Sequence, residues 1–273
     1  MTPYAEVIGD PIAQSKSPAI HNFWLGKLGI EGDYRRCLVR VGELGEYFSA
    51  RARDPDWRGC NITMPHKIAA LEFVHKHRDP SFPIEPINIA VPLRGQIEGV
   101  NSDTLGLLEP LNAILQGQPA PRGPAIVVGS GGVLFSAMWA LSALGYAPIH
   151  IVMRDEAKMA VVTKDYRGVH ARPMLIGSPL PLANLLVNAT PLGMTGFPEF
   201  PLSLDSLSSD AIVFETIYSP LETALLREAR ARGLRTVDGL SMLIAQASAG
   251  FQAFFKAPAP REHDAELRAL LTS

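Results

Sequence analysis

The sequence has few cysteines and no excess of charge of either sign. Of its 273 residues only Cys37 and Cys60 are cysteines, and they do not form a CxxC pair. A disulfide framework and a cysteine-based zinc site are therefore not expected, and a reducing compartment is the default. The formal net charge of −2 predicts neither a nucleic-acid partner nor binding to an anionic membrane. The expected partner is a small molecule.

Long apolar runs are also missing, and we expect no signal peptide in the opening residues. No segment approaches the roughly 18 consecutive apolar residues of a membrane span. The opening MTPYAEVIGDPIAQSKS has neither the basic nor the apolar region of a signal peptide. We therefore expect no membrane partner and a cytoplasmic location. His75 and His77 form an HxH without a third ligand in the pattern, so we expect no metal site.

What the sequence does contain is an alternation of short apolar runs and helical stretches, which is typical of an α/β protein. The length favours two domains, and a segment rich in proline and glycine at 116–124 is typical of a loop or a domain junction. Before it we predict strands within 4–10, 33–41 and 57–65, a hairpin at 87–99, and helices at 17–30, 42–52, 66–74 and 101–115. After it we predict strands within 125–129, 147–154, 185–190 and 211–218, and helices after 129 and over 240–255.

A glycine-rich turn follows the apolar run AIVV in this second half. Gly129, Gly131 and Gly132 stand between a strand that is apolar throughout and the start of a helix. Such a turn lets backbone N–H groups and the helix N-terminus approach a pyrophosphate. The pattern is GxGG and not the full GxGxxG, so a tight turn without a ligand remains an alternative.

The next predicted strand ends in VMRDEAK. In a dinucleotide-binding fold, this strand end faces the adenosine ribose, where basic groups favour the 2′-phosphate of NADP and an acid favours the 2′-hydroxyl of NAD. Arg154 and Lys158 are basic whereas Asp155 is acidic. A solvated charged loop is the competing interpretation.

Near the N-terminus, Ser15 and Ser17 flank Lys16 just before a helix that starts with proline. Hydroxyls two residues apart in an extended chain face the same way. With the helix N-terminus behind them, they could hold a carboxylate or a polyol. The alternative is an ordinary helix cap with a spare serine.

The segment GCNITMPHK ends a predicted strand with several polar side chains. Asn61 and Thr63 are two residues apart and are expected on one face, and Lys67 follows the strand end, where ligand crevices form in open α/β sheets. Asp103 begins the helix at 101–115. An ammonium group beside a carboxylate makes an acid/base pair suited to a ketone and an alcohol. A surface salt bridge is the alternative.

Several motifs in order resemble the shikimate dehydrogenase family. They are VIGDPIAQSKSPAIHN, NITMPHK, NSD at 101–103, NATPLGM, ETIYSPLET and VDGLSMLIAQASAGF, and together they cover almost the whole chain. The resemblance implies an oxidoreductase of aromatic amino acid biosynthesis. It would catalyse reversible hydride transfer between 3-dehydroshikimate and shikimate with NADP or NAD. It also implies a discontinuous substrate domain of residues 1–103 and 238–273, and a Rossmann domain of residues 104–237 across a cleft.

The resemblance further implies roles for individual residues. Lys67 and Asp103 would be the catalytic pair, and Ser15 and Ser17 would hold the substrate carboxylate. The remaining substrate contacts would come from Asn61, Thr63, Asn88 and Gln246. The cofactor would be bound at its pyrophosphate by Gly129, Gly131 and Gly132, at the adenosine end by Arg154 and Lys158, and on the nicotinamide side by Thr190 and Gly239.

The chain also departs from the family pattern. Ile89, Val100 and Thr104 replace usual residues around the second and third motifs, and Asp155 stands where NADP-specific members have a threonine. These changes leave open NADP, which we prefer, or NAD, and shikimate or a relative such as quinate or aminoshikimate. A metabolite-sensing domain without catalysis is an alternative of another class, although retention of Lys67 and Asp103 argues for an enzyme. A monomer or a homodimer would fit equally.

Overall fold

A computed structural model describes residues 2–75, 85–116, 122–159 and 169–273 of the chain. His77 and residues 117–121 of the predicted junction lie outside the described residues. The chain forms two compact α/β units, which confirms the predicted fold class. The first unit contains the described residues up to 75, residues 85–103 and residues 244–273, and the second contains the described part of 104–243. The chain passes between the units within helices α3 (Asp103–Ile114) and α7 (Gly239–Phe255).

The first unit is built on a five-stranded mixed sheet with the strand order β2-β1-β3-β4-β5. Its first three strands run parallel, and the last two form an antiparallel hairpin that pairs with β3. The strands are β1 (Tyr4–Gly9), β2 (Asp33–Leu38), β3 (Trp57–Ile62), β4 (Ile89–Leu93) and β5 (Gln96–Val100). Each of them coincides with a predicted strand or with the predicted hairpin.

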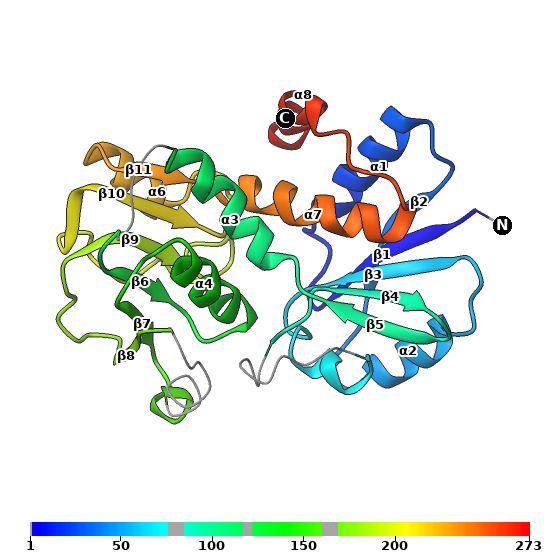
Figure 1. Cartoon of the computed structure of the whole chain (residues 1–273), viewed down its shortest axis with the longest axis horizontal. Helices are drawn as coiled ribbons and strands as arrows, with labels where there is room; N and C mark the ends of the chain where they lie inside the picture. The colour runs from blue at the N-terminus through cyan, green and yellow to red at the C-terminus, as the bar shows by residue number, and fades with distance from the viewer. Residues whose placement is uncertain (1, 76–84, 117–121, 160–168) are drawn as a thin grey trace. The chain divides into compact units, whose positions relative to one another are not determined.

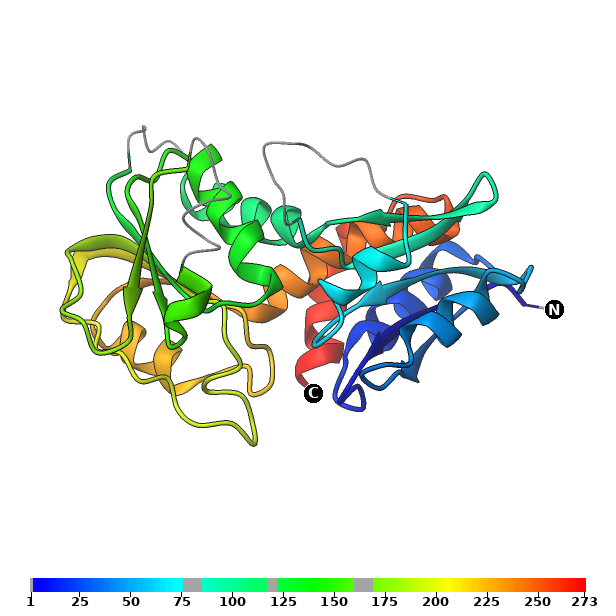
Figure 2. The ribbon, with the colours of Figure 1, turned by 90° about the horizontal axis from the view of Figure 1, so that it is seen from below.

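Helices cover both faces of this sheet (Figure 2). The side chains of β1 point alternately to the two faces and so contribute to two hydrophobic cores. Ile8 packs with Phe48 of α2 (Leu44–Arg51) on one face. Val7 packs with Phe254 of α7 on the other face, where α1 (Ser17–Leu28) also lies. Two 3₁₀ turns and a last helix complete the unit: η1 (Ala69–Glu72), η2 (Arg261–His263) and α8 (Asp264–Thr272).

The helix predicted over 66–74 is wrong in extent, since only the short turn η1 forms. The chain beyond it is drawn out to pair with β5: the amide of His75 donates to Ile97 O at 2.7 Å, and the amide of Gly99 donates to His75 O at 2.9 Å. A residue held in this bridge cannot extend a helix. The tertiary pairing therefore overrides a helical sequence pattern.

The second unit contains six parallel strands in the order β8-β7-β6-β9-β10-β11. They are β6 (Ala125–Val128), β7 (Ile149–Met153), β8 (Ala171–Leu175), β9 (Ala183–Asn188), β10 (Leu207–Glu215) and β11 (Arg235–Val237). Counted along this unit, the order is 3-2-1-4-5-6, the arrangement of dinucleotide-binding folds. The direction of winding reverses between β6 and β9, so the carboxyl ends of these two strands flank the expected ligand crevice.

Helices also lie on both faces of this second sheet (Figure 1). α3 and α4 (Gly132–Ala143) pack on the face that carries Val127, and α6 (Ala224–Ala231) packs on the face that carries Val128. The sequence did not predict α6 or β8. β8 is an edge strand with Pro173 in its middle, which an edge tolerates but which hides the strand pattern. No helix in the described part of the chain is long and apolar enough to cross a membrane.

Candidate active site

The segment with the two serines is not extended, contrary to the prediction. Ser17 is the first residue of α1, and Lys16 before it has helical backbone angles. Pro18 favours a helix start at this point because its fixed φ suits the first turn. The amide of Ser17 donates to Oγ of Ser15 at 3.3 Å, and both serines are buried. The Ser15 side chain therefore lies at the backbone of Ser17 at a helix start, and the two serines are not related by strand alternation.

The histidine and asparagine that follow in the same motif have structural roles. Asn22 clamps α1 to β2, since its Nδ2 donates to Tyr34 O at 2.8 Å and its Oδ1 accepts from the Tyr34 amide at 2.9 Å. The ring of His21 stacks on the Tyr34 ring at 3.9 Å between centroids. Burial lowers the pKa of His21 to about 3, so the imidazole is neutral.

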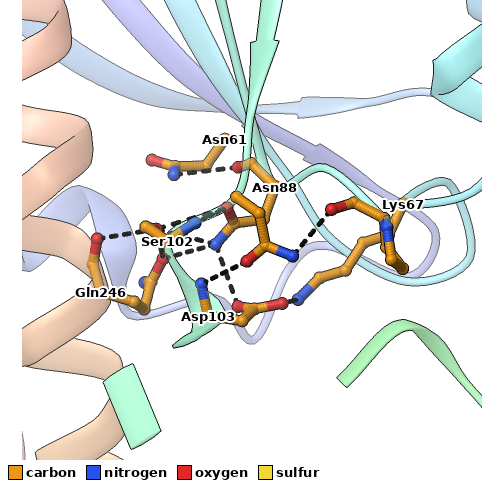
Figure 3. Close-up of polar contacts among 8 residues, drawn as sticks. Asn61, Lys67, Asn88, Ser102, Asp103 and Gln246 are labelled. Carbon is orange, nitrogen blue, oxygen red and sulfur yellow. Dashed lines mark hydrogen bonds and ion pairs between the residues drawn. The ribbon is translucent and has the colours of Figure 1, made fainter. Parts of the chain in front are cut away.

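Lys67 and Asp103 form an ion pair within the first unit (Figure 3). Lys67 lies beyond β3, after the stop at Pro65, and Asp103 is the first residue of α3. The exposed fraction of the side chain is 16% for Lys67 and 4% for Asp103. Nζ of Lys67 donates to Oδ2 of Asp103. The ammonium group therefore keeps access to solvent, whereas the carboxylate that holds it is buried.

Asn88 connects this pair to the rest of the unit. Its Nδ2 donates to Oδ1 of Asp103 and to Oγ of Ser102, both at 2.9 Å, and lies 3.1 Å from Oε1 of Gln246. Its Oδ1 accepts from the Ser102 amide at 2.7 Å. Both amide hydrogens of Asn88 thus have acceptors inside the protein. This arrangement makes Asn88 an orienting group for Asp103.

Ser102 is a member of this network that the sequence analysis did not single out. It is buried, and its hydroxyl donates to the backbone oxygen of Gln246 in α7 at 3.0 Å. The side chain of Asn101 lies at the start of α3, where its Oδ1 accepts from the Asp103 amide at 2.8 Å. The motif NSD placed Ser102 beside Asp103, but only the fold brings it against Asn88 and Gln246.

Asn61 is held on the same sheet from two sides. Its Oδ1 accepts from the Tyr34 hydroxyl at 2.6 Å, and its Nδ2 donates to Asn88 O at 3.2 Å. Burial raises the pKa of Tyr34 well above its ordinary value, so the phenol stays protonated and donates. Thr63 lies just past the end of β3 and is half-buried, with its amide bonded to Ile8 O at 2.9 Å. The β1–β3 ladder therefore extends to Thr63.

The glycine turn after β6 fits a pyrophosphate. Gly129 has φ of 142°, and a Cβ there would lie 2.7 Å from Ala189 O, so the fold itself requires this glycine. Gly131 is different, because its φ of −93° suits any residue and a Cβ would meet nothing of the described chain within 4 Å. It precedes α4, which begins at Gly132, and as a glycine it offers no side-chain cap. Open space in front of a helix N-terminus suits an anionic group.

Thr190 and Gly239 are fixed by the protein around them. The Thr190 hydroxyl donates to Oδ1 of Asn188 at 2.7 Å and accepts from the Leu192 amide at 3.1 Å, so it shapes the loop after β9. Gly239 begins α7, and a Cβ there would lie 2.4 Å from the carbonyl of Ile217. This close contact is sufficient to require a glycine at position 239, whether or not a ligand binds.

A buried acid, Glu215, lies at the end of β10 and was not predicted from the sequence. Its carboxylate accepts from Asn188 Nδ2 at 3.0 Å, from the Ile217 amide at 3.1 Å and from the Thr223 hydroxyl at 3.1 Å. Burial outweighs these bonds and raises its pKa to about 7. Glu215 therefore ties the loops after β9 and β10 to the N-cap of α6.

The charged residues after β7 are arranged unequally. Arg154 and Lys158 are exposed. Asp155 accepts from the Ala157 amide at 3.0 Å and lies 3.9 Å from Lys158 Nζ. Its carboxylate is thus engaged as a local cap, which leaves Arg154 as the charged group without an acidic partner among the described residues. Among all the residues that the structure describes, no group of three or more His, Cys, Asp or Glu residues could hold a metal ion.

Comparison with known proteins finds similar chains along almost the whole length of this one. The family model described as the shikimate dehydrogenase substrate binding domain matches residues 7–90. The chain is 46% identical to a shikimate dehydrogenase (NADP(+)) of Sphingopyxis alaskensis, covering 100% of this chain and 98% of the relative. It is 37% identical to a protein of the same name from Cereibacter sphaeroides, covering 93% of this chain and 91% of the relative.

Two solved structures are also similar to this chain over almost their whole length. Shikimate 5-dehydrogenase from Thermus thermophilus, in complex with NADP(H) and shikimate, is 29% identical with a TM-score of 0.82, over 98% of this chain and 99% of that one. Quinate dehydrogenase from Corynebacterium glutamicum, in complex with NAD, is 26% identical with a TM-score of 0.85, over 98% of this chain and 99% of that one. With near-complete coverage of a relative at 46% identity, the chain belongs to the shikimate dehydrogenase family.

Proposed function

We propose that this protein catalyses the reversible conversion of 3-dehydroshikimate and shikimate with NADP as the redox partner. The observation that carries the proposal is the Lys67–Asp103 pair, held in place by Asn88, in a chain of this family. In the direction of reduction, the Lys67 ammonium donates a proton to the oxygen of the ketone as the carbon receives hydride. In the direction of oxidation, the lysine takes the proton back from the hydroxyl. Asp103 keeps the ammonium group at the reacting oxygen.

The first unit is the proposed substrate domain. The hydroxyls of Ser15 and Ser17 would hold the substrate carboxylate at the start of α1. Asn61, Thr63 and Gln246 would bind the ring hydroxyls. Asn88 would act mainly on Asp103, because both of its amide hydrogens already have acceptors.

The second unit is the proposed cofactor domain, and its residues fit a dinucleotide. Gly131, Gly132 and the N-terminus of α4 would hold the pyrophosphate, and Arg154 and Lys158 would face the 2′-phosphate. Thr190 and Gly239 would lie on the nicotinamide side by shaping the loops there. The nicotinamide ring, when bound, supplies or accepts the hydride. The engaged carboxylate of Asp155 supports NADP over NAD, since it is used as a local cap.

The test is a steady-state assay of purified protein that follows reduced nicotinamide, with shikimate and quinate each paired with NADP and NAD. We expect the highest kcat/KM for shikimate with NADP. A preference for quinate, for aminoshikimate in a further assay, or for NAD would identify a specialised paralogue. Shikimate binding without turnover in any pairing would support a metabolite sensor and overturn the proposal. A cytoplasmic location, and the choice between monomer and homodimer, remain predictions for fractionation and light scattering.

A further inference from the structure

Two basic residues lie in or against the segment that carries Ser15 and Ser17. The first, Lys16, lies between the two serines, but its ammonium group donates to the backbone oxygen of Leu271 in α8. A cation near the last turn of a helix interacts favourably with the helix dipole. Lys16 therefore stabilises the C-terminal helix, and its charge is directed to that carbonyl.

The second, Arg36, lies on β2 and reaches the serine segment itself. Its Nε and Nη2 donate to the backbone oxygen of Ser15 at 3.0 and 2.5 Å. Arg36 shares a strand face with Tyr34, two residues earlier, whose hydroxyl binds Asn61. One face of β2 therefore contacts two of the proposed substrate-binding residues, Asn61 and Ser15.

Among the described residues, the charge of Arg36 has no acidic partner. Its neighbour Arg35 lies 3.7 Å from the carboxylate of Glu6, and Arg40 lies 3.6 Å from Glu43. For Arg36, no carboxylate of the described residues lies within the 4.0 Å that defines an ion pair. Arg36 is exposed, and its guanidinium group lies at the backbone oxygen of Ser15, in the segment whose two serines are buried.

The two hydroxyls are themselves neutral donors. Oγ of Ser15 already accepts from the Ser17 amide at 3.3 Å, which leaves its hydrogen to donate outward. Neutral donors can bind a carboxylate or an uncharged oxygen. A nearby unpaired cation favours the carboxylate.

We propose that Arg36 is a specificity-determining and positioning residue: it fixes the Ser15 carbonyl and makes the serine site selective for substrates that carry a carboxylate. The inference rests on the proposed function, because it assumes that Ser15 and Ser17 face the substrate carboxylate. Its action is through Ser15 and through charge, so it concerns substrate affinity and not the rate of the chemical step.

The experiment compares wild type, Arg36→Gln and Arg36→Lys on shikimate and on its uncharged methyl ester. Arg35→Gln, one residue away on the opposite strand face, removes the same charge and serves as the matched control. We expect Arg36→Gln to raise the KM for shikimate roughly ten-fold, as for loss of a charge across a partly solvated site, with kcat within about two-fold. The KM for the ester should rise less, because the ester loses only the positioning of Ser15. The KM of Arg36→Lys for shikimate should lie between those of wild type and Arg36→Gln, because lysine keeps the charge but loses the paired donors.

Shikimate binding is also measured by calorimetry, so that the result does not depend on turnover, and thermal unfolding checks that each variant is folded. Equal losses for shikimate and its ester, or no loss for either, would overturn the inference. Ser15→Ala and Ser17→Ala separate the role of Arg36 from the proposed carboxylate site itself. If they weaken shikimate binding while Arg36→Gln does not, only the role of Arg36 fails. If they leave shikimate binding unchanged, the proposed carboxylate site itself is wrong.

Discussion

Nδ2 of Asn88 lies 2.9 Å from Oδ1 of Asp103, on the carboxylate oxygen that Lys67 does not use. The two oxygens of one buried carboxylate are thus divided between the amide of Asn88 and the ammonium group of Lys67, the proposed acid/base. Because Asn88 is itself held by Ser102 and Gln246, the position of the lysine depends on the residues that precede β4 and α3 and on α7. Each of these contacts can be tested separately.

Loss of the Asn88 amide should misplace the acid/base pair. We expect Asn88→Ala to lower kcat by roughly one to two orders of magnitude, the scale for a small displacement of a catalytic group. The KM for NADP should stay within about two-fold. Asn112→Ala, an exposed asparagine of α3, is the control and should behave as wild type. If Asn88→Ala and Asp103→Ala gave additive losses in a double-mutant cycle, Asn88 would not act through Asp103.

Removal of the ammonium group should abolish most turnover. We expect Lys67→Ala to lower kcat by roughly two to four orders of magnitude, the usual contribution of a general acid/base, while shikimate binding changes far less. Lys27→Ala is the matched control, because Lys27 pairs with Glu266 near the surface. Near-normal turnover of Lys67→Ala would contradict the proposed role of the lysine.

Two glycines of the same turn should respond in opposite ways. Gly131→Ala meets open space at an ordinary φ, so the apo protein should keep its stability or gain ~0.4–1 kcal/mol. NADP binding, measured by calorimetry, should weaken at least ten-fold because the methyl group occupies the proposed pyrophosphate position. Gly129→Ala should destabilise the fold, since its φ of 142° and the contact with Ala189 both exclude a Cβ. Unchanged NADP binding by folded Gly131→Ala would place the pyrophosphate elsewhere.

Glu215 should make stability depend on pH. Its pKa is raised from 4.5 to about 7, so between these values the folded state binds more protons than the unfolded state. Stability from this group is therefore present below pH ~4.5, falls as pH rises to ~7, and is level above that pH. The total is on the order of 3 kcal/mol, at ~1.4 kcal/mol per pKa unit.

The measurement is urea unfolding of wild type and Glu215→Gln at several pH values between 4.5 and 8. The difference between the two proteins isolates Glu215, because the other titrating groups are shared. The free energy of unfolding of Glu215→Gln should lack the decline with pH that Glu215 causes in wild type. A pH-independent difference would show that Glu215 keeps an ordinary pKa in the folded protein.

The basic group after β7 should decide cofactor choice. We expect Arg154→Gln to lower kcat/KM with NADP by roughly ten- to a hundred-fold, the effect of losing a charged hydrogen bond, and to leave kcat/KM with NAD nearly unchanged. Arg53→Gln, an exposed arginine of the first unit, is the control. Equal effects on both cofactors would remove Arg154 from the 2′-phosphate site.

Local patterns in the sequence were sufficient for most of the fold. The apolar run at 125–128 predicts a strand buried on both faces, and the glycines after it predict a strand-to-helix turn; both occur in the structure. The motifs carried the family, which the relatives confirm. These features depend on neighbours a few residues away, so a sequence displays them directly.

Contacts between distant residues were decided only by the tertiary structure. Lys67 and Asp103 are 36 residues apart, and Asn88 reaches Gln246 across 158 residues, because β3, β4 and α7 are brought together in one unit. The segment after Lys67 lost its predicted helix to pairing with β5, and Glu215 owes its raised pKa to the elements that bury it. The sequence by itself determined most of the strands, the glycine turn and the motifs, because these follow from local patterns. Burial, hydrogen-bond partners and pKa shifts were decided by the fold, because they depend on which distant segments exclude water from a side chain.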